Sequence, residues 1–266
     1  MTESGNATLI RSIPLRDRIV ILSALAATTI LAWAYLIDMA VKMDRMMSMD
    51  GMADMMQIAP WGAAEFGSML LMWVIMMIGM MVPTAVPMAL IYAAISRKAA
   101  RQGTTLAPTA FFVSGYIVIW SLFSVAATVA QWGLDQAALL SPMMVLSSPG
   151  IGAGLLIVTG IYQLTPLKDT CLRHCRSPAH FISQSWKPGK MGALRMGMEH
   201  GAYCLGCCWI LMGLLFFGGV MSLLWIAGIT LFVLLEKVLP FGLVGGRIAG
   251  GGMILAGSIS LGTWIF

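Results

Sequence analysis

The chain has 266 residues, of which 59% are hydrophobic and only 10% are charged, and its formal net charge is +5. Soluble domains carry about 25% charged residues, so this composition excludes an ordinary soluble protein. The positive charge is not accompanied by interleaved basic and aromatic residues, a P-loop or a dinucleotide-binding fingerprint, so no nucleic acid or nucleotide is expected as a ligand.

Apolar runs of about 20 residues recur along the chain, and this is the length that an α-helix needs to cross a bilayer. We therefore predict an all-α, polytopic transmembrane helix bundle. It is expected to form a single transmembrane domain over residues 1–266, surrounded by the lipid bilayer. Seven spans are predicted, at about residues 19–40, 65–95, 108–131, 150–166, 196–218, 221–239 and 248–266.

The first apolar run continues past Ala32-Trp33-Ala34, a weak match to a signal-peptidase site, and is expected to be retained as a helix. Lys and Arg gather in alternate loops. By the positive-inside rule, this places the N-terminus in the cytoplasm and, after seven spans, the C-terminus outside. The pattern is typical of a multi-pass protein of a bacterial-type inner (cytoplasmic) membrane. A methionine-rich loop at 42–60 then lies outside, and a basic Cys/His loop at 167–195 lies inside.

The predicted outer loop is rich in methionine but otherwise polar, with Asp44, Asp50 and Asp54, so core packing has little use for its methionines. Thioether sulfur is a soft ligand that favours Cu(I) over harder ions, and the loop is interpreted as a copper-capture segment. An amphipathic surface segment whose methionines dip into lipid is the alternative. The candidate ligands are Met43, Met46, Met47, Met49, Met52, Met55 and Met56.

The second predicted helix contains Pro83 and Pro87, which remove backbone donors. A kink is expected there, with freed carbonyls that need other partners. The methionines of this helix all fall on one half of it at about 100° per residue. A flexible packing surface and a thioether ladder leading inward explain this segregation equally well. The methionines are Met69, Met72, Met76, Met77, Met80, Met81 and Met88, of which Met76, Met80 and Met81 are the candidate ligands.

All five cysteines lie between Cys171 and Cys208. In the predicted inner loop, Cys171 and Cys175 would share one face if the segment is helical, and His174 lies between them. A closed zinc site formed by these three side chains and one cysteine of the next helix is an alternative, although the spacing is not that of a standard zinc finger.

The fifth predicted helix carries the strongest constellation. Met196, His200, Cys204 and Cys207 follow one another at spacings of four, four and three residues, which places them on one face, with Cys208 at its margin. At about 1.5 Å per residue, the cysteines are expected near mid-bilayer, level with methionines of the second helix. A buried cysteine is often only a small hydrophobe, but three cysteines and a histidine on one face favour a soft-metal site.

Two further patterns concern helix packing. Gly242, Gly246 and Gly250 recur every four residues toward the last predicted helix, and this spacing is expected to allow close helix approach. Glu236 and Lys237, near the end of the sixth predicted helix, are expected to form an ion pair at the membrane interface.

Three segments resemble the family of predicted metal-binding integral membrane proteins, some of whose members act as copper chaperones for copper enzymes. The segments are residues 80–88 (MMVPTAVPM), 162–178 (YQLTPLKDTCLRHCRSP) and 200–209 (HGAYCLGCCW). The resemblance covers nearly the whole chain from the second predicted helix onward but does not include the loop methionines. It implies metal binding, with copper as the expected metal, at Cys171, Cys175, His200, Cys204, Cys207 and Cys208.

The leading hypothesis is a membrane-embedded Cu(I)-binding protein that acts as a copper chaperone or metallation factor, or that moves copper across the membrane, through Met, Cys and His ligands. Its expected partner is a soluble or periplasmic copper carrier or a client copper enzyme, and no enzymatic activity is expected. One alternative is a membrane thiol–disulfide oxidoreductase that uses Cys204 with Cys207 and Cys171 with Cys175. The other is a structural or assembly subunit of a membrane complex.

Overall fold

The computed structural model describes residues 11, 13–47, 61–103, 107–141 and 144–265. Within these residues the regular structure is helical, apart from one isolated bridge between Leu140 and Leu146, so the all-α prediction is confirmed. The helices are α2 (Leu15–Met47), α4 (Ala63–Arg101), α5 (Thr109–Gln136), α6 (Pro149–Gln163), α7 (Pro166–Arg176), α8 (Pro178–Ser185), α9 (Gly189–Gly213), α10 (Leu215–Gly218), α11 (Leu223–Val238) and α12 (Gly242–Ile265).

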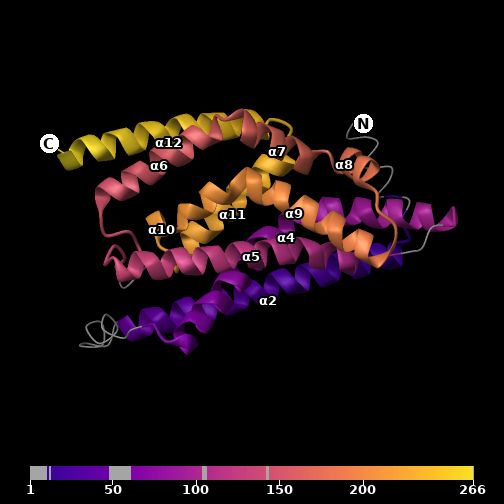
Figure 1. Cartoon of the computed structure of the whole chain (residues 1–266), viewed down its shortest axis with the longest axis horizontal. Coiled ribbons are helices and arrows are strands. Elements are labelled where there is room, and N and C mark those ends of the chain that lie inside the picture. Colours follow the sequence, from indigo (N-terminus) through magenta and orange to yellow (C-terminus); the bar gives the residue numbers. More distant parts are fainter. Residues whose placement is uncertain (1–10, 12, 48–60, 104–106, 142–143, 266) are drawn as a thin grey trace.

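The long helices run along the long axis of the molecule in layers (Figure 1). On one side, α4 packs against both α2 and α5, and on the opposite side α6 packs against α12. Between these layers lie α9, which packs against α5 and α7, and α11, which contacts both α4 and α12. The layer formed by α9 and α11 is thus enclosed between apolar helices.

Within the described residues, five helical stretches are long and apolar enough to cross a membrane: Leu15–Arg45, Ala63–Arg101, Thr109–Gln136, Gly189–Gly218 and Gly242–Trp264. A sixth candidate is α6 together with α7, although the pair is bent by 63°. The predicted span 221–239 occurs as α11, whose 16 residues extend only about 24 Å, less than the ~30 Å of a bilayer core. Helix length therefore supports five or six of the seven predicted spans.

The backbone of α4 continues through both of its prolines. Pro83 has no N–H to donate to the carbonyl of Gly79, one turn earlier. Trp33 of α2 donates its indole Nε1–H to that oxygen at 3.2 Å. A side chain of a neighbouring helix therefore satisfies the carbonyl that the first proline leaves free, as a backbone in an apolar environment requires.

Glycines allow α12 to approach its neighbours closely. A Cβ on Gly250 would lie 2.7 Å from the Cβ of Gln163 and 2.9 Å from the carbonyl oxygen of Gly160, both on α6. A Cβ on Gly246 would collide with the carboxylate of Glu236 on α11. The close approach expected at these two glycines is therefore present, and it joins α12 to two different helices.

The predicted inner loop 167–195 is largely helical. Thr165 caps α7, because its side-chain oxygen accepts a hydrogen bond from the backbone N–H of Lys168, and Pro166 occupies the first turn. Pro178 likewise stands at the start of α8. The two cysteines of this segment therefore lie on a helix that packs against α9.

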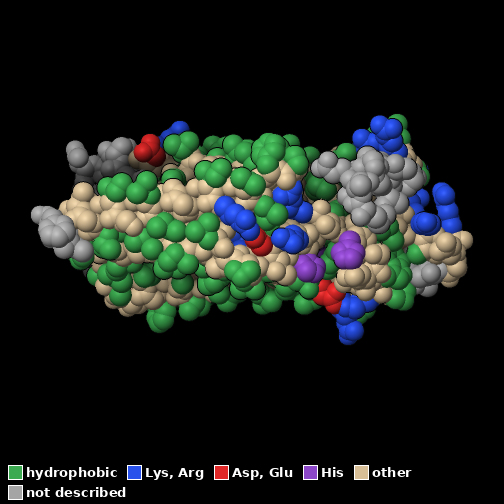
Figure 2. Space-filling view, turned by 90° about the horizontal axis from the view of Figure 1, so that it is seen from above, with side chains coloured by type: hydrophobic (Ala, Val, Ile, Leu, Met, Phe, Trp, Pro, Cys, Tyr) green, Lys and Arg blue, Asp and Glu red, His purple; other side chains and the backbone are tan. Residues whose placement is uncertain are grey.

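Ion pairs attach α7 to α11 and α12. Lys168 of α7 and Glu236 of α11 form a pair whose side chains are only 2% and 3% exposed. Arg247 of α12 donates to Asp169 of α7 at 2.5 Å. Figure 2 shows basic and acidic side chains gathered about midway along the molecule, next to a largely hydrophobic surface. These pairs fix the position of α7 within the bundle.

Candidate metal centre

The predicted sulfur-bearing face of α9 points into the protein. Met196, His200, Cys204, Cys207 and Cys208 are all at most 3% exposed. The three cysteines belong to the main apolar core of the bundle. The spacing of four, four and three residues thus gives one buried stripe, as the helical periodicity predicts.

A fourth thiol reaches this stripe from α7. Cys175 lies close enough to interact with the thiols of Cys204 and Cys207. Cys171, one turn earlier on α7, lies against α9, and a Cβ on Gly206 would be 2.9 Å from its Sγ. All five cysteines are free thiols. Two helices therefore bring four thiols together, with Cys171 at the edge of the group.

Cys204 is the most heavily contacted of the thiols. Its Sγ lies 3.0 Å from the hydroxyl of Tyr116 on α5 and 2.9 Å from Nζ of Lys237 on α11. The Lys237 ammonium also donates to Thr84 Oγ1 on α4 at 3.1 Å, and the Tyr116 hydroxyl donates to the backbone carbonyl of Met81 at 3.1 Å. Side chains of α5 and α11 thus meet at the sulfur of an α9 residue, and each of these two side chains is held in turn by α4. The Tyr116 hydroxyl contacts both Cys204 and the Met81 carbonyl, so Cys204 is level with this methionine of α4, as the sequence predicts.

The expected ion pair between Glu236 and Lys237 is wrong. Glu236 pairs with Lys168 of α7, whereas Lys237 turns toward Cys204. The physical reason is helical geometry, because neighbouring residues on a helix point in directions about 100° apart and cannot face the same partner. Lys237 is a polar member of the centre that the sequence interpretation did not include.

The thiols are not preorganised as a cage. Cys207 and Cys208 each donate to the backbone carbonyl of Cys204 at 3.0 Å. No three His, Cys, Asp or Glu side chains in the described parts of the chain form a group that could hold an ion as they stand. A metal ion at this group would require these thiols to rotate about their Cα–Cβ bonds, away from the carbonyl.

His200 lies one turn before Cys204, in an aromatic enclosure. Its ring centroid is 6.0 Å from that of Phe112, 5.6 Å from that of Tyr116 and 5.7 Å from that of Phe181. The ring Nδ1 is buried and has no hydrogen-bond partner. An unpaired buried nitrogen is unfavourable, so this atom has the capacity to bind a ligand that the protein alone does not satisfy.

The methionines of α4 also face inward. Met72, Met76, Met77, Met80 and Met81 are fully buried and belong to the same apolar core as the α9 cysteines. By contrast, Leu71 is 54% exposed, and Val74, Ile75 and Ile78 are partly exposed. The predicted segregation of methionine from the branched aliphatic residues is present, with buried Val82 as an exception.

Two predicted ligands lie apart from the thiols. The Sδ of Met196 accepts a hydrogen bond from the backbone N–H of Lys187 at 3.3 Å, within a separate apolar cluster. His174 stacks on Tyr203 at 4.3 Å between ring centroids, and its Nδ1 lies 2.8 Å from the carbonyl oxygen of Thr170. The closed zinc site that the sequence leaves open as an alternative needs His174 beside the cysteines, and the described residues contain no such group.

The methionine-rich segment is only partly described. Met43 lies on α2, is 8% exposed and packs in the main core. The backbones of Met46 and Met47 belong to the last turn of α2, so these residues extend a helix and do not begin a loop. The other candidate ligands lie outside the described residues; they are Met49, Met52, Met55 and Met56.

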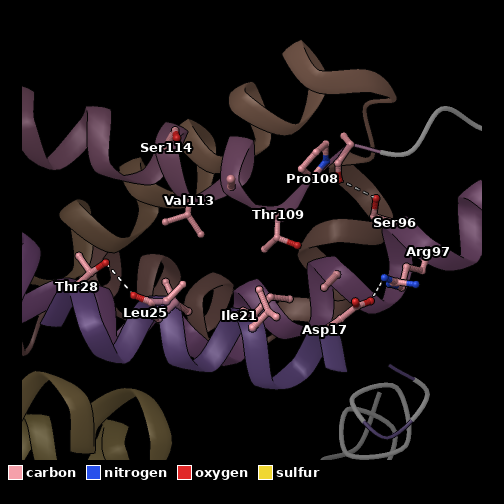
Figure 3. A pocket seen from close by; sticks show the side chains of 15 residues that line it. Asp17, Ile21, Leu25, Thr28, Ser96, Arg97, Pro108, Thr109, Val113 and Ser114 are labelled. Atoms are coloured by element: carbon pink, nitrogen blue, oxygen red, sulfur yellow. Dashed lines mark hydrogen bonds and ion pairs between the residues drawn. The ribbon is translucent and has the colours of Figure 1, made fainter. Parts of the chain in front are cut away.

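A cavity of about 540 Å³ lies between α2, α4 and α5. Ile21, Leu25 and Val113 contribute apolar walls, and Asp17 pairs with Arg97 beside them (Figure 3). No cysteine, histidine or methionine of the described residues is among its lining side chains. The cavity is therefore distinct from the candidate metal centre.

Comparison with known proteins gives one result. A family model described as "PpoB2: Copper chaperone" matches residues 70–260, which include most of α4 and all of the helices from α5 to α11. No curated protein and no solved structure matches the chain. The matched region contains every cysteine and histidine of the sequence.

Proposed function

This chain belongs to the PpoB2 copper chaperone family, and from this premise we propose that it holds Cu(I) inside the membrane on the thiols of α9 and α7 and delivers it to a client protein. The observation that carries the proposal is the meeting of four thiols at Cys204, enclosed by four helices. Thiolate and thioether sulfur select Cu(I) among the common biological cations. A buried site also keeps the ion away from water and from competing ligands.

Each ligand has a distinct part in the proposal. Cys204 is the central ligand, because it is the thiol that the others approach. Cys175 supplies a second thiolate from α7, so binding joins two helices. Cys207 and Cys208 offer further thiolates once they release the Cys204 carbonyl, and His200 offers its unpaired nitrogen. Cu(I) accepts two or three soft ligands, so the group has more donors than one ion needs and permits exchange one ligand at a time.

The methionines are proposed as weaker sites on the way to the thiols. The loop methionines would capture copper on the outer face, and Met76, Met80 and Met81 would pass it inward along α4. Thioethers carry no charge and bind Cu(I) less strongly than thiolates, so the ion gains affinity as it approaches Cys204. Cys171, at the edge of the group and half-buried, is placed to exchange the ion with a copper carrier or client enzyme.

Copper delivery explains this centre better than thiol–disulfide exchange. A thiol that exchanges with a partner protein must be accessible to the attacking sulfur. Cys204 and Cys207 are each 1% exposed, at the middle of a continuous helix. Their burial favours a small ion as the species that enters.

The test is Cu(I) binding by the full chain, purified in detergent under anaerobic conditions. Competition with a chromophoric Cu(I) chelator should give tight binding by the unaltered protein and at least about a hundredfold weaker binding after combined Cys204→Ser, Cys207→Ser and Cys208→Ser substitution. Met191→Leu is the control, because it also removes a sulfur atom of α9, but one that is 63% exposed and does not belong to the buried group of thiols. Unchanged stoichiometry and affinity in the triple variant would reject the site.

A further inference from the structure

Lys237 places a positive charge at the centre of a group of potential copper ligands. Its Nζ contacts Cys204 Sγ at 2.9 Å and Thr84 Oγ1 at 3.1 Å. Tyr116, whose hydroxyl contacts the same sulfur, is 1% exposed, and Cys204 is also 1% exposed. Lys237 itself is partly buried, and an ammonium that faces such groups favours an anionic partner, because an unpaired charge in an apolar region is costly.

The nearest carboxylate in sequence does not supply that partner. Glu236 is bound to Lys168 in a buried pair, on a different side of α11. The atoms within hydrogen-bonding distance of the Lys237 ammonium among the described contacts are the thiol of Cys204 and the hydroxyl of Thr84, and the hydroxyl of Tyr116 lies on the same sulfur. The group beside the ammonium that can become an anion on binding a metal ion is therefore the Cys204 thiol.

The charge of the bound complex follows from its composition. When Cu(I) replaces the protons of two thiols, the complex [Cu(S-Cys)₂] carries one negative charge, and the displaced protons leave the site. An adjacent ammonium makes the total charge zero. Two thiolates with a divalent ion such as Zn²⁺ are already neutral, so beside the same ammonium Zn²⁺ needs a third deprotonated thiol before the total charge is zero, whereas Cu(I) needs only two. In a region of low dielectric constant, the neutral combination is strongly preferred.

We propose that Lys237 is the counter-charge of the copper site and that it selects a monovalent ion over a divalent one. The proposal rests on the copper-binding function proposed above. Thr84 and Tyr116 act as positioning residues, because the first holds the ammonium and the second holds the sulfur that it faces. Selection by charge adds to the preference of sulfur for soft ions, which alone does not exclude Zn²⁺ from a thiolate site.

The experiment measures two affinities in the same protein. Cu(I) and Zn²⁺ affinities are determined by chelator competition for the full chain in detergent, and the ratio of the two affinities is compared among variants. Lys237→Gln removes the charge but keeps a hydrogen-bond donor of similar reach, and it should lower the ratio by about tenfold or more. Lys237→Arg keeps the charge and should retain the ratio within about threefold. Lys98→Gln, at an exposed position of α4, is the matched control.

The outcomes separate this inference from the function on which it rests. An unaltered ratio in Lys237→Gln, together with loss of Cu(I) binding in the triple cysteine variant, would overturn the role of Lys237 and leave the copper site intact. Retained Cu(I) binding in the triple cysteine variant would overturn the site itself. If Lys237→Gln does not fold, Thr84→Val provides the test, because it removes the oxygen that holds the ammonium. The ratio of Cu(I) to Zn²⁺ affinity should then fall about threefold or more. An unchanged ratio in this variant would overturn the inference.

Discussion

His200 combines tight aromatic enclosure with an unsatisfied nitrogen. A phenylalanine at this position would keep the packing against Phe112, Tyr116 and Phe181 and would remove a buried polar atom that has no hydrogen bond. We therefore predict that His200→Phe preserves or raises the melting temperature while lowering Cu(I) affinity by about tenfold or more, because one ligand is lost. Tryptophan fluorescence on heating and chelator competition measure the two quantities.

The control for this prediction is the same substitution at His174. That ring stacks on Tyr203 and does not join the thiols, so His174→Phe should leave Cu(I) affinity unaltered. A His200→Phe protein with the affinity of the unaltered chain would show that His200 only fills space.

At the residue scale, the sequence predicts which residues of α9 face inward, but not which residues of other helices contact them. The inward face of α9 follows from the spacing of His200, Cys204 and Cys207. Tyr116 and Lys237 come from other helices, and no periodicity within α9 indicates which residues of α5 or α11 will contact it. A lysine in the last turn of a strongly apolar helix is the feature that points to Lys237, since its charge requires a partner within the protein or at the interface.

At the scale of helices, the contact between α6 and α12 depends on the absence of side chains. A Cβ at Gly250 would lie 2.7 Å from the Cβ of Gln163, closer than packed side chains allow, and 2.9 Å from the backbone oxygen of Gly160. Gly250→Ala should therefore push the two helices apart and lower the melting temperature, although alanine favours the helix by up to about 1 kcal/mol. Thermal unfolding in detergent measures the effect.

Gly251 is the matched control, because a Cβ there would meet nothing within 4 Å. Gly251→Ala should preserve or raise the melting temperature through helix propensity alone. Equal melting temperatures for the two variants would contradict the close contact between α6 and α12.

The sequence predicts the positions of the helices, but not where they bend or stop. Each of the seven predicted segments contains a helix, because apolar composition and length indicate helices in this class of protein. The bend after α6 and the shortness of α11 depend on how the ends pack. The Thr165-Pro166 cap is a helix-start signal present in the sequence, but the basic composition of the segment that follows favours a loop and outweighs it.

At the scale of the whole molecule, α2 begins toward the end of the molecule opposite to the end of α12 (Figure 1). The Lys and Arg distribution predicts that the first of these ends faces the cytoplasm. In a bacterial host, a fluorescent protein that matures only in the cytoplasm should fluoresce when fused to the N-terminus and stay dark when fused to the C-terminus. Alkaline phosphatase, which is active only outside, should give the reverse.

An internal reporter provides the control for this orientation. Gly103 lies in the exposed turn after α4 and has a φ of +89°, so it marks a tight reversal of the chain. A fluorescent protein inserted there should match the N-terminal fusion. Fluorescence from the C-terminal fusion, with a dark insertion at Gly103, would reverse the orientation.

The buried pair between Lys168 and Glu236 constrains how the molecule can open. Separating two such charges without water around them is costly, so α7 and α11 behave as one rigid arm. That arm carries Cys175 on one segment and Lys237 on the other. The two segments are therefore expected to stay together in any rearrangement of the bundle, which couples a displacement of the Cys175 thiol to a displacement of the Lys237 ammonium.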